Sequence, residues 1–291
     1  MCKPFVKWAG GKSQLLTEVR KFYPTSSSGI TKYCEPFVGG GAVLFDIMSH
    51  IEFEEILIND INLDLIKTYN IIKNDVAELI INLSSIEKEF QEADSSKRKL
   101  IYTKYRKEFN KNKRNDLRTA TLFIFLNKTC FNGLYRVNSK GEFNVPMGDY
   151  KNPCICDERN LTAISKALKN ATIMSGDYKE CLSFIDNKTF VYLDPPYRPL
   201  TETAKFTSYT KDGFSDKEQI ELAEFCKHLK ELGAKILISN SDPQNINSED
   251  MFFDDLYDSF NIVRVLAKRY INCNSQKRGA VKELLISSDF N

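Results

Sequence analysis

Short apolar runs rich in β-branched and aromatic residues alternate with amphipathic segments in two parts of the chain. The first part predicts strands at residues 31–36 and 55–59, with a helix ending near Met48 between them. The second part predicts strands at 172–174, 189–194 and 234–239, a helix at 216–232, and a closing hairpin formed by 261–268 and 281–288. Strands that alternate with helices predict an α/β fold with a mostly parallel sheet.

Residues 63–156 interrupt this alternation. They predict long helices at 65–82, 84–110 and 115–127, followed by a loop rich in Asn, Gly and aromatic residues. We therefore expect a mainly helical domain inserted into a discontinuous α/β domain made of residues 1–62 and 157–291.

The net charge of +2 conceals an asymmetry along the chain. Residues 97–151 hold 14 Lys and Arg against 4 Asp and Glu, which leaves 27 basic and 35 acidic residues elsewhere. A short charge run is usually a solvated helical face, but this basic block is long and interleaved with aromatic residues. The pattern favours a nucleic acid as partner.

Several functional classes are disfavoured by composition. No stretch reaches the ~18 apolar residues of a membrane span, and the N-terminus lacks a signal-peptide run, so we expect a cytoplasmic protein without a membrane partner. The eight cysteines then count as reduced thiols. With only two histidines, neither a metal site nor a His-based triad is expected.

The segment Asp194-Pro195-Pro196-Tyr197 ends an apolar run typical of a strand buried on both faces. The prolines cannot continue a strand ladder, so Asp194 should lie at the carboxyl end of a core strand, where open α/β sheets bind ligands. This segment could bind a planar base by its amino group. The Asp194 carboxylate and a backbone carbonyl without a ladder partner would accept hydrogen bonds, and the Tyr197 ring would stack on the base. The alternative is a strand-ending turn with a helix-capping Asp.

A glycine loop, Gly39-Gly40-Gly41, follows the first predicted strand, and Asp60 ends the second. This spacing is typical of a carboxylate that binds the ribose hydroxyls of an adenosine. Three consecutive glycines depart from the dinucleotide fingerprint, so S-adenosylmethionine fits better than NAD. The Trp8 ring could contact the sulfonium of this cofactor, and Lys12 could bind its carboxylate. The alternative is that Trp8 packs in the core and Lys12 is solvated.

Residues 132–151 carry β-hairpin turn signals around Ser139-Lys140-Gly141. A two-stranded ribbon fits the major groove, where Arg136 could bind a guanine. Lys140 and Lys151 could contact phosphates. A structural hairpin that only joins helices remains the alternative.

These motifs together resemble one family. The segments Lys7–Lys12, Glu35–Gly41, Asp60, Asn132–Tyr150 and Asp194–Tyr197 occur in the order found in the Dam-type DNA adenine-N6 methyltransferases of the D12 class. The resemblance covers nearly the whole chain. It implies a Rossmann-like seven-stranded sheet with a reversed last strand, and an inserted, mainly helical DNA-recognition domain.

The resemblance also implies roles for individual residues. The flipped adenine would be held by Asp194, Pro195, Pro196 and Tyr197, and S-adenosylmethionine by Trp8, Lys12, Glu35, Phe37, Gly39, Gly41, Asp60 and Asp194. Family members similar at 132–150 typically recognise GATC. Double-stranded DNA would be contacted by Lys7, Asn132, Leu134, Arg136, Lys140, Pro146, Tyr150 and Lys151. Asp149 departs from the pattern, because a basic residue is expected beside the matching tyrosine.

The predicted reaction is methyl transfer from S-adenosylmethionine to N6 of adenine after the base leaves the stack. Residues 198–214 are either a lid over the site or an ordinary connection. Two rival functions stay open, namely methylation of RNA adenine or a glutamine amide, and DNA binding without catalysis. The sequence leaves open whether the protein is a monomer or a weak dimer.

Overall fold

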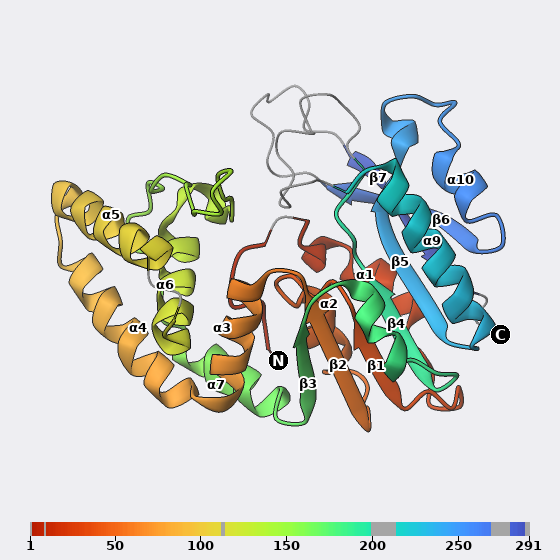
Figure 1. Ribbon diagram of the computed structural model, residues 1–291, viewed down its shortest axis with the longest axis horizontal. Helices are drawn as coiled ribbons and strands as arrows, with labels where there is room; N and C mark the ends of the chain where they lie inside the picture. The colour runs from red at the N-terminus through yellow and green to blue at the C-terminus, as the bar shows by residue number, and fades with distance from the viewer. Residues whose placement is uncertain (1, 9, 112–113, 199–213, 269–279, 289–291) are drawn as a thin grey trace. The chain divides into compact units, whose positions relative to one another are not determined.

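The computed structural model describes residues 2–8, 10–111, 114–198, 214–268 and 280–288 (Figure 1). Most of the segment 198–214, which is either a lid or an ordinary connection, therefore lies outside the described residues. The chain forms two compact units, each built from three segments. Unit 1 consists of Met1–Gly11, Val38–Ile51 and Asn59–Gly176, and unit 2 of Lys12–Phe37, Glu52–Ile58 and Asp177–Asn291.

Seven strands form one sheet in the order β3-β2-β1-β4-β5-β7-β6. They are β1 (Lys32–Glu35), β2 (Glu55–Asp60), β3 (Ala171–Ser175), β4 (Thr189–Leu193), β5 (Lys235–Ser241), β6 (Asn261–Lys268) and β7 (Ala280–Ser287). Strand β1 is parallel to β2 and β4, and β4 is parallel to β5, whereas β7 is antiparallel to β5 and β6. The predicted α/β fold with a reversed last strand is confirmed.

Strand β4 lies in the middle of this sheet, and every residue from Thr189 to Leu193 is buried. A strand covered on both faces needs an uninterrupted apolar run, which explains its sequence. The parallel register pairs Val191 with Cys34 of β1 and Leu193 with Ile238 of β5. The carboxyl ends of β1, β4 and β5 therefore lie at one edge of the sheet.

Unit 2 also contains short helices around its strands. They are η1 (Lys12–Gln14), α1 (Leu16–Val19), η2 (Arg20–Phe22), η4 (Tyr178–Phe184), α9 (Asp216–Glu231), η5 (Pro243–Asn245) and α10 (Phe252–Leu256). A capping box starts α9, in which the Ser215 and Glu218 side chains cap each other's backbone N–H groups. Helix α9 packs against β5.

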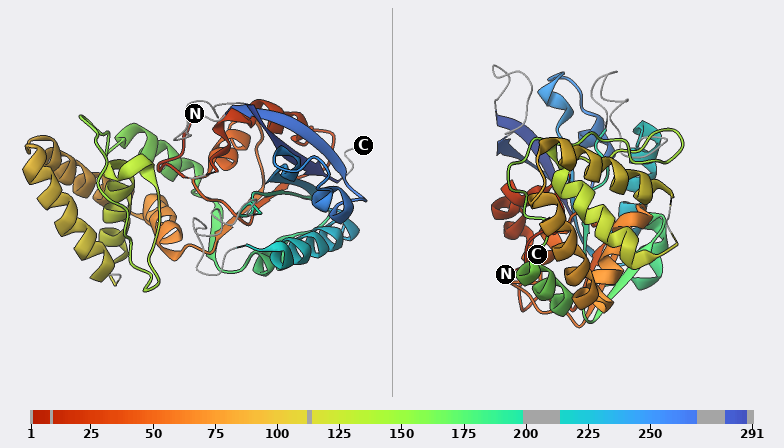
Figure 2. Two further views of the ribbon diagram at one scale, coloured as in Figure 1. Left: turned by 90° about the horizontal axis from the view of Figure 1, so that it is seen from above. Right: turned by 90° about the vertical axis from the view of Figure 1, so that its left-hand side faces the viewer.

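Unit 1 is mainly helical. It contains α2 (Ala42–Ile47), α3 (Leu63–Asn74), α4 (Val76–Gln91), α5 (Ser95–Lys111), α6 (Asp116–Thr129), η3 (Phe131–Gly133) and α7 (Glu158–Ala167). Helix α6 is apolar around most of its circumference and packs against α3, α4 and α5, which makes it the core helix of this unit (Figure 2). None of the helices in the described ranges combines the length and the hydropathy that crossing a bilayer requires.

The predicted boundaries of the first two long helices, 65–82 and 84–110, are wrong. Helix α3 ends before Asp75, and α4 then continues past residue 83 to Gln91. The polar residues around Leu83 suggested a break, but they lie on the outer face while Leu83 itself is buried. The second break falls instead near Asp94, whose carboxylate accepts the backbone N–H of Lys97 at 2.9 Å and caps α5.

The predicted two-stranded ribbon within 132–151 does not form regular strands. The chain reverses at the expected turn, where Gly141 N–H donates to Asn138 C=O. Pairing in this part of the structure includes two isolated antiparallel bridges, Cys130 with Met147 and Val137 with Phe143. Around the second bridge, Asn138 N–H donates to the Glu142 carbonyl at 2.9 Å and Asn144 N–H to the Arg136 carbonyl at 3.1 Å. Side chains from neighbouring helices also hold the segment, as described below.

Candidate functional site

The Asp-Pro-Pro-Tyr segment lies directly after β4, at the carboxyl edge of the sheet. Asp194 forms an ion pair with Lys12, whose Nζ lies 2.7 Å from its Oδ1. The Lys12 side chain is 4% exposed and that of Asp194 is 21% exposed. Lys12 Nζ also lies 4.6 Å from the centre of the Tyr197 ring. One buried cation therefore contacts both ends of the segment.

Removal from water raises the pKa of Asp194, and this effect outweighs the lowering by Lys12. Glu283 raises the pKa further, and the result is a value of about 6. Glu283 also accepts the Tyr197 hydroxyl at 2.7 Å. Asp194 is thus an anion near neutral pH, but one that a modest change in its surroundings would protonate.

A buried amide relay fixes the Pro196 peptide. Gln219 Nε2 donates to the Pro196 carbonyl at 3.1 Å, and Asn240 Nδ2 donates to Gln219 Oε1 at 3.1 Å. Both amide side chains are buried. Sequence reasoning missed Gln219; the available signal was a polar residue at a core position of α9.

Glu35 and Phe37 lie at and just beyond the end of β1. Glu35 is buried and accepts the Tyr33 hydroxyl at 2.6 Å. The Phe37 ring packs against Tyr178 at 5.3 Å and meets Phe214 edge-on at 6.2 Å between ring centres. These contacts fix both side chains within unit 2.

In unit 1, Asp60 binds the glycine loop. Its Oδ2 accepts the Gly39 N–H at 3.0 Å, and its Oδ1 accepts the Asn62 N–H at 2.9 Å. Burial raises the pKa of Asp60, while these two bonds oppose the rise. Each carboxylate oxygen keeps a further lone pair, so Asp60 can accept hydroxyl donors as well.

Two of the loop glycines cannot be replaced without strain. Gly39 and Gly41 have φ of 48° and 76°, in the left-handed region. A Cβ at Gly39 would lie 2.8 Å from the Trp8 ring, and one at Gly41 would lie 2.6 Å from the Tyr69 hydroxyl. The loop is therefore tightly packed as well as unusual in backbone conformation.

Trp8 belongs to an aromatic cluster of unit 1. Its ring stacks on Tyr135 at 5.8 Å between centres and is tilted against Phe123 at 6.3 Å. The Tyr135 hydroxyl in turn donates to Asp64 at 3.0 Å. Trp8 thus packs in the core of unit 1, as the alternative to a cofactor contact predicted. It also touches the glycine loop.

The predicted DNA-contact residues gather on unit 1. Lys7 is exposed, and its Nζ lies 3.1 Å from the Tyr150 hydroxyl and 4.2 Å from the ring centre. Exposed Arg136 donates to Asn144 Oδ1 at 2.8 Å, and the Pro146 carbonyl accepts the Phe131 N–H at 2.9 Å. Lys140, Lys151, Asn132 and Asp149 are also exposed, and Leu134 is half-buried.

Side chains of α5 bind the return limb of this segment, in addition to its backbone bonds to the other limb. The Asn110 amide bonds both the N–H and the carbonyl of Phe143, at 2.9 and 3.0 Å. The Tyr102 hydroxyl donates to the Val145 carbonyl at 2.8 Å, and Arg98 donates to the Lys151 carbonyl at 2.8 Å. At Phe143 these bonds satisfy backbone groups that face away from the opposite limb, whereas Asn138 and Asn144 bond across to that limb.

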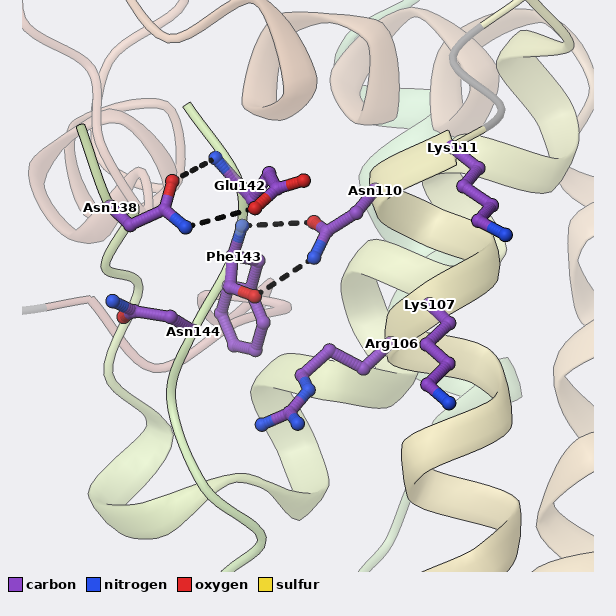
Figure 3. Close-up of a pocket in the computed structure, with 8 residues that line it drawn as sticks. All are labelled: Arg106, Lys107, Asn110, Lys111, Asn138, Glu142, Phe143 and Asn144. Carbon is purple, nitrogen blue, oxygen red and sulfur yellow. Dashed lines mark hydrogen bonds between the residues drawn. The ribbon is translucent and has the colours of Figure 1, made fainter. Parts of the chain in front are cut away.

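A polar hollow of about 360 Å³ lies between α5 and this segment (Figure 3). Its lining residues are Arg106, Lys107, Asn110, Lys111, Asn138, Glu142, Phe143 and Asn144. Three of them are cationic and one is anionic. The α5 cations were part of the basic block but were not singled out from the sequence, because the opposite wall comes from residues 138–144, which only the fold brings next to α5.

Phe131 is a second residue that sequence reasoning missed. Its side chain is 53% exposed, although it adjoins the buried Cys130. It stands beside Asn132, whose φ of 55° is left-handed. The ring of Phe131 is therefore accessible to solvent on this turn.

The family model and the similar sequences agree on one family. A profile described as D12 class N6 adenine-specific DNA methyltransferase matches residues 8–271. The type II methyltransferase M.MjaIII of Methanocaldococcus jannaschii is 52% identical over 289 residues, 98% of each chain. The DNA adenine methylase of Escherichia coli is 35% identical and covers 97% of this chain and 94% of its own. The rRNA methyltransferase aviRa of Streptomyces viridochromogenes aligns with 99% of this chain and 90% of its own, at 13% identity and a TM-score of 0.41.

Proposed function

Because the chain belongs to the D12 class of N6 adenine-specific DNA methyltransferases, we propose that it methylates adenine within GATC in duplex DNA. The observation that carries the proposal is Asp194, held by Lys12 at the carboxyl end of β4 and followed by two prolines and an aromatic ring. The sequence preference is supported by the resemblance of residues 132–150 to GATC-recognising members. We place this activity in the cytoplasm.

The family implies S-adenosylmethionine as the methyl donor, and residues of this chain fit it. Asp60 would accept the ribose hydroxyls, since its oxygens retain acceptor capacity beside the glycine loop. Gly39 and Gly41 would let the cofactor approach the backbone. When bound, S-adenosylmethionine supplies an electrophilic methyl group. The roles of Trp8, Glu35 and Phe37 as further cofactor contacts stay predictions.

Asp194 would act on the adenine amino group. The N6 lone pair is delocalised into the ring, so the nitrogen is a poor nucleophile until hydrogen bonds localise that pair. Asp194 and the Pro195 carbonyl would accept hydrogen bonds from the two amino N–H groups and disperse the positive charge that develops on N6. After methyl transfer N6 would release one proton, through the Asp194 carboxylate, to solvent. Lys12 would keep Asp194 ionised, and Gln219 would fix the orientation of the peptide that follows.

The target atom is stacked inside a duplex, so the adenine must be extruded to be methylated. Tyr197 would stack on the extruded base, and its hydroxyl bond to Glu283 would hold the ring in place. Exposed Phe131 would insert beside the vacated position, as apolar wedges do in other DNA-bending proteins. Together these two rings would offset part of the cost of unstacking.

DNA contacts would come from unit 1. Arg136 would bind a guanine edge, and Lys7, Asn132, Leu134, Pro146 and Tyr150 would contact bases or backbone nearby. Lys140 and Lys151 would bind phosphates. The hollow between α5 and the recognition segment would bind a further phosphate through Arg106, Lys107 or Lys111. In this proposal residues 63–156 form the recognition domain, and residues 1–62 and 157–291 form the catalytic domain.

Methyl transfer from radiolabelled S-adenosylmethionine tests the proposal. The acceptors are duplexes that contain GATC, duplexes with one base changed, an RNA of the same sequence, and a glutamine-containing peptide. We expect label in N6-methyladenine of the GATC duplex. Transfer to RNA or to the peptide alone would support the rival methyltransferase function, and no transfer despite DNA binding would support the silent DNA-binding protein.

A further inference from the structure

Asn127, in the last turn of α6, joins two distant segments of unit 1. Its Oδ1 accepts the Lys7 N–H at 2.8 Å, and its Nδ2 donates to the Lys7 carbonyl at 2.8 Å. Nδ2 also donates to the Gly133 carbonyl at 3.0 Å. The side chain is 2% exposed. One buried amide thus uses its acceptor and both donors on backbone groups of two segments.

The two segments that Asn127 joins also pack directly on each other. Gly133 has a φ of 64°, and a Cβ there would lie 2.5 Å from both Cβ and Cδ of Lys7. The Lys7 stem therefore occupies the space that a larger residue would need. Beyond this contact, Lys7 Nζ reaches the Tyr150 hydroxyl and ring.

The turn that precedes Gly133 is strained. Asn132 is the only described residue other than glycine with a positive φ, at 55°. Such a conformation costs free energy and persists only where the surroundings impose it. The Gly133 carbonyl lies one peptide beyond Asn132, so the bond from Asn127 fixes the turn directly at its exit.

From these contacts we infer that Asn127 is a positioning residue for sequence recognition. It sets the backbone of Lys7 and of the Asn132–Gly133 turn at a fixed separation, so that Lys7 and the turn meet the DNA as one rigid surface. The inference rests on the proposed function, because Lys7 and Asn132 contact DNA only in that proposal. Asn127 itself is buried and touches no base.

The test compares kcat/KM for a GATC duplex with kcat/KM for duplexes that carry one changed base. Asn127→Leu keeps the size of the side chain and removes all three bonds. Asn127→Asp keeps the acceptor for Lys7 and replaces the donor with an oxygen that repels two carbonyls. For both variants we expect discrimination to fall about tenfold, the loss that follows when one base contact is weakened. We expect KM for DNA to rise, and kcat on saturating GATC duplex to stay within about twofold.

A matched control separates positioning from general stability. Thr121 is buried in the same helix, and its hydroxyl donates to the Leu117 carbonyl at 2.8 Å, away from the Asn127 contacts. Thr121→Val should lower the thermal unfolding midpoint without changing discrimination. If Thr121→Val and the Asn127 variants reduce discrimination equally at equal loss of stability, the inference is overturned.

A double-mutant cycle with Lys7→Met gives the decisive measurement. If Asn127 acts through Lys7, the loss of discrimination in the double variant will be smaller than the product of the two single losses. Independent effects would overturn the inference, as would unchanged discrimination in a folded Asn127→Asp variant. Wild-type protein that methylates no duplex DNA would instead refute the proposed function itself.

Discussion

The ion pair between Lys12 and Asp194 leads to a quantitative prediction for the pH dependence of kcat. The ionised form of Asp194 is the stronger acceptor for N6 and carries the charge that offsets the positive charge developing there, and its pKa is about 6, so kcat should fall as the pH drops below about 6. Lys12 lies 2.7 Å away and holds that pKa down. Lys12→Met removes the cation and should move the acid limb of the profile to higher pH.

The size of the expected shift in the Asp194 pKa follows from the strength of close charge pairs. An opposite charge at this range typically lowers a carboxyl pKa by ~1–3 units, so loss of Lys12 should raise the value to roughly 7–9. At pH 7 the ionised fraction of Asp194 would fall from about nine tenths to between about one half and one hundredth. The rate at pH 7 should fall by the same ratio, roughly twofold to a hundredfold.

Single-turnover methylation at saturating S-adenosylmethionine and DNA, measured from pH 5 to pH 9, provides the assay. Lys12→Arg is the control, because it keeps the charge and should leave the acid limb near its original pH. In Lys12→Met the deficit should shrink as the pH rises. A deficit of the same size at every pH would show that Lys12 does not act by ionising Asp194, and would refute the reasoning.

Three further substitutions test other parts of the proposal. Asp194→Ala should reduce single-turnover methylation to background while duplex affinity, measured by fluorescence anisotropy, changes less than about threefold; turnover near the wild-type rate would exclude its catalytic role. Arg136→Ala should relax discrimination at one base pair by ~1–3 kcal/mol in competition assays, and unchanged preference at all four positions would contradict the guanine contact. Gly133→Ala should lower the free energy of unfolding by ~1–3 kcal/mol in urea, because its new Cβ meets Lys7 in a left-handed backbone. Gly141→Ala, with a φ of 75° but open space around it, should cost less.

The fold of unit 2 could be predicted from the sequence because its signals are local. The run that ends at Asp194 is apolar throughout since β4 is buried on both faces, and Ser215 with Glu218 forms a cap within four residues. The helix boundaries of unit 1 could not be predicted in the same way. Whether the polar residues near Leu83 end a helix depends on which face α6 covers, and that contact is distant in sequence.

Residues of the candidate site could also be predicted where their signal is local in sequence, and not where it depends on distant contacts. Asp194, Asp60 and the glycine loop were recognisable because each has a fixed place at a strand end. Gln219 and Asn127 each occupy a core position of a helix, but that position does not indicate which backbone groups the amide will bind. The ion pair of Asp194 was missed for a related reason, because 182 residues separate Asp194 from Lys12 along the chain.

The anchoring of the recognition segment by helix side chains limits how its specificity can be transplanted. A regular ribbon carries its own hydrogen bonds and could be grafted between related enzymes as one piece. Here the segment depends on Arg98, Tyr102, Asn110 and Asn127 of the helices beneath it. A chimera that exchanges only residues 131–151 would separate the segment from its supports, whereas one that also carries α5 and α6 would preserve them.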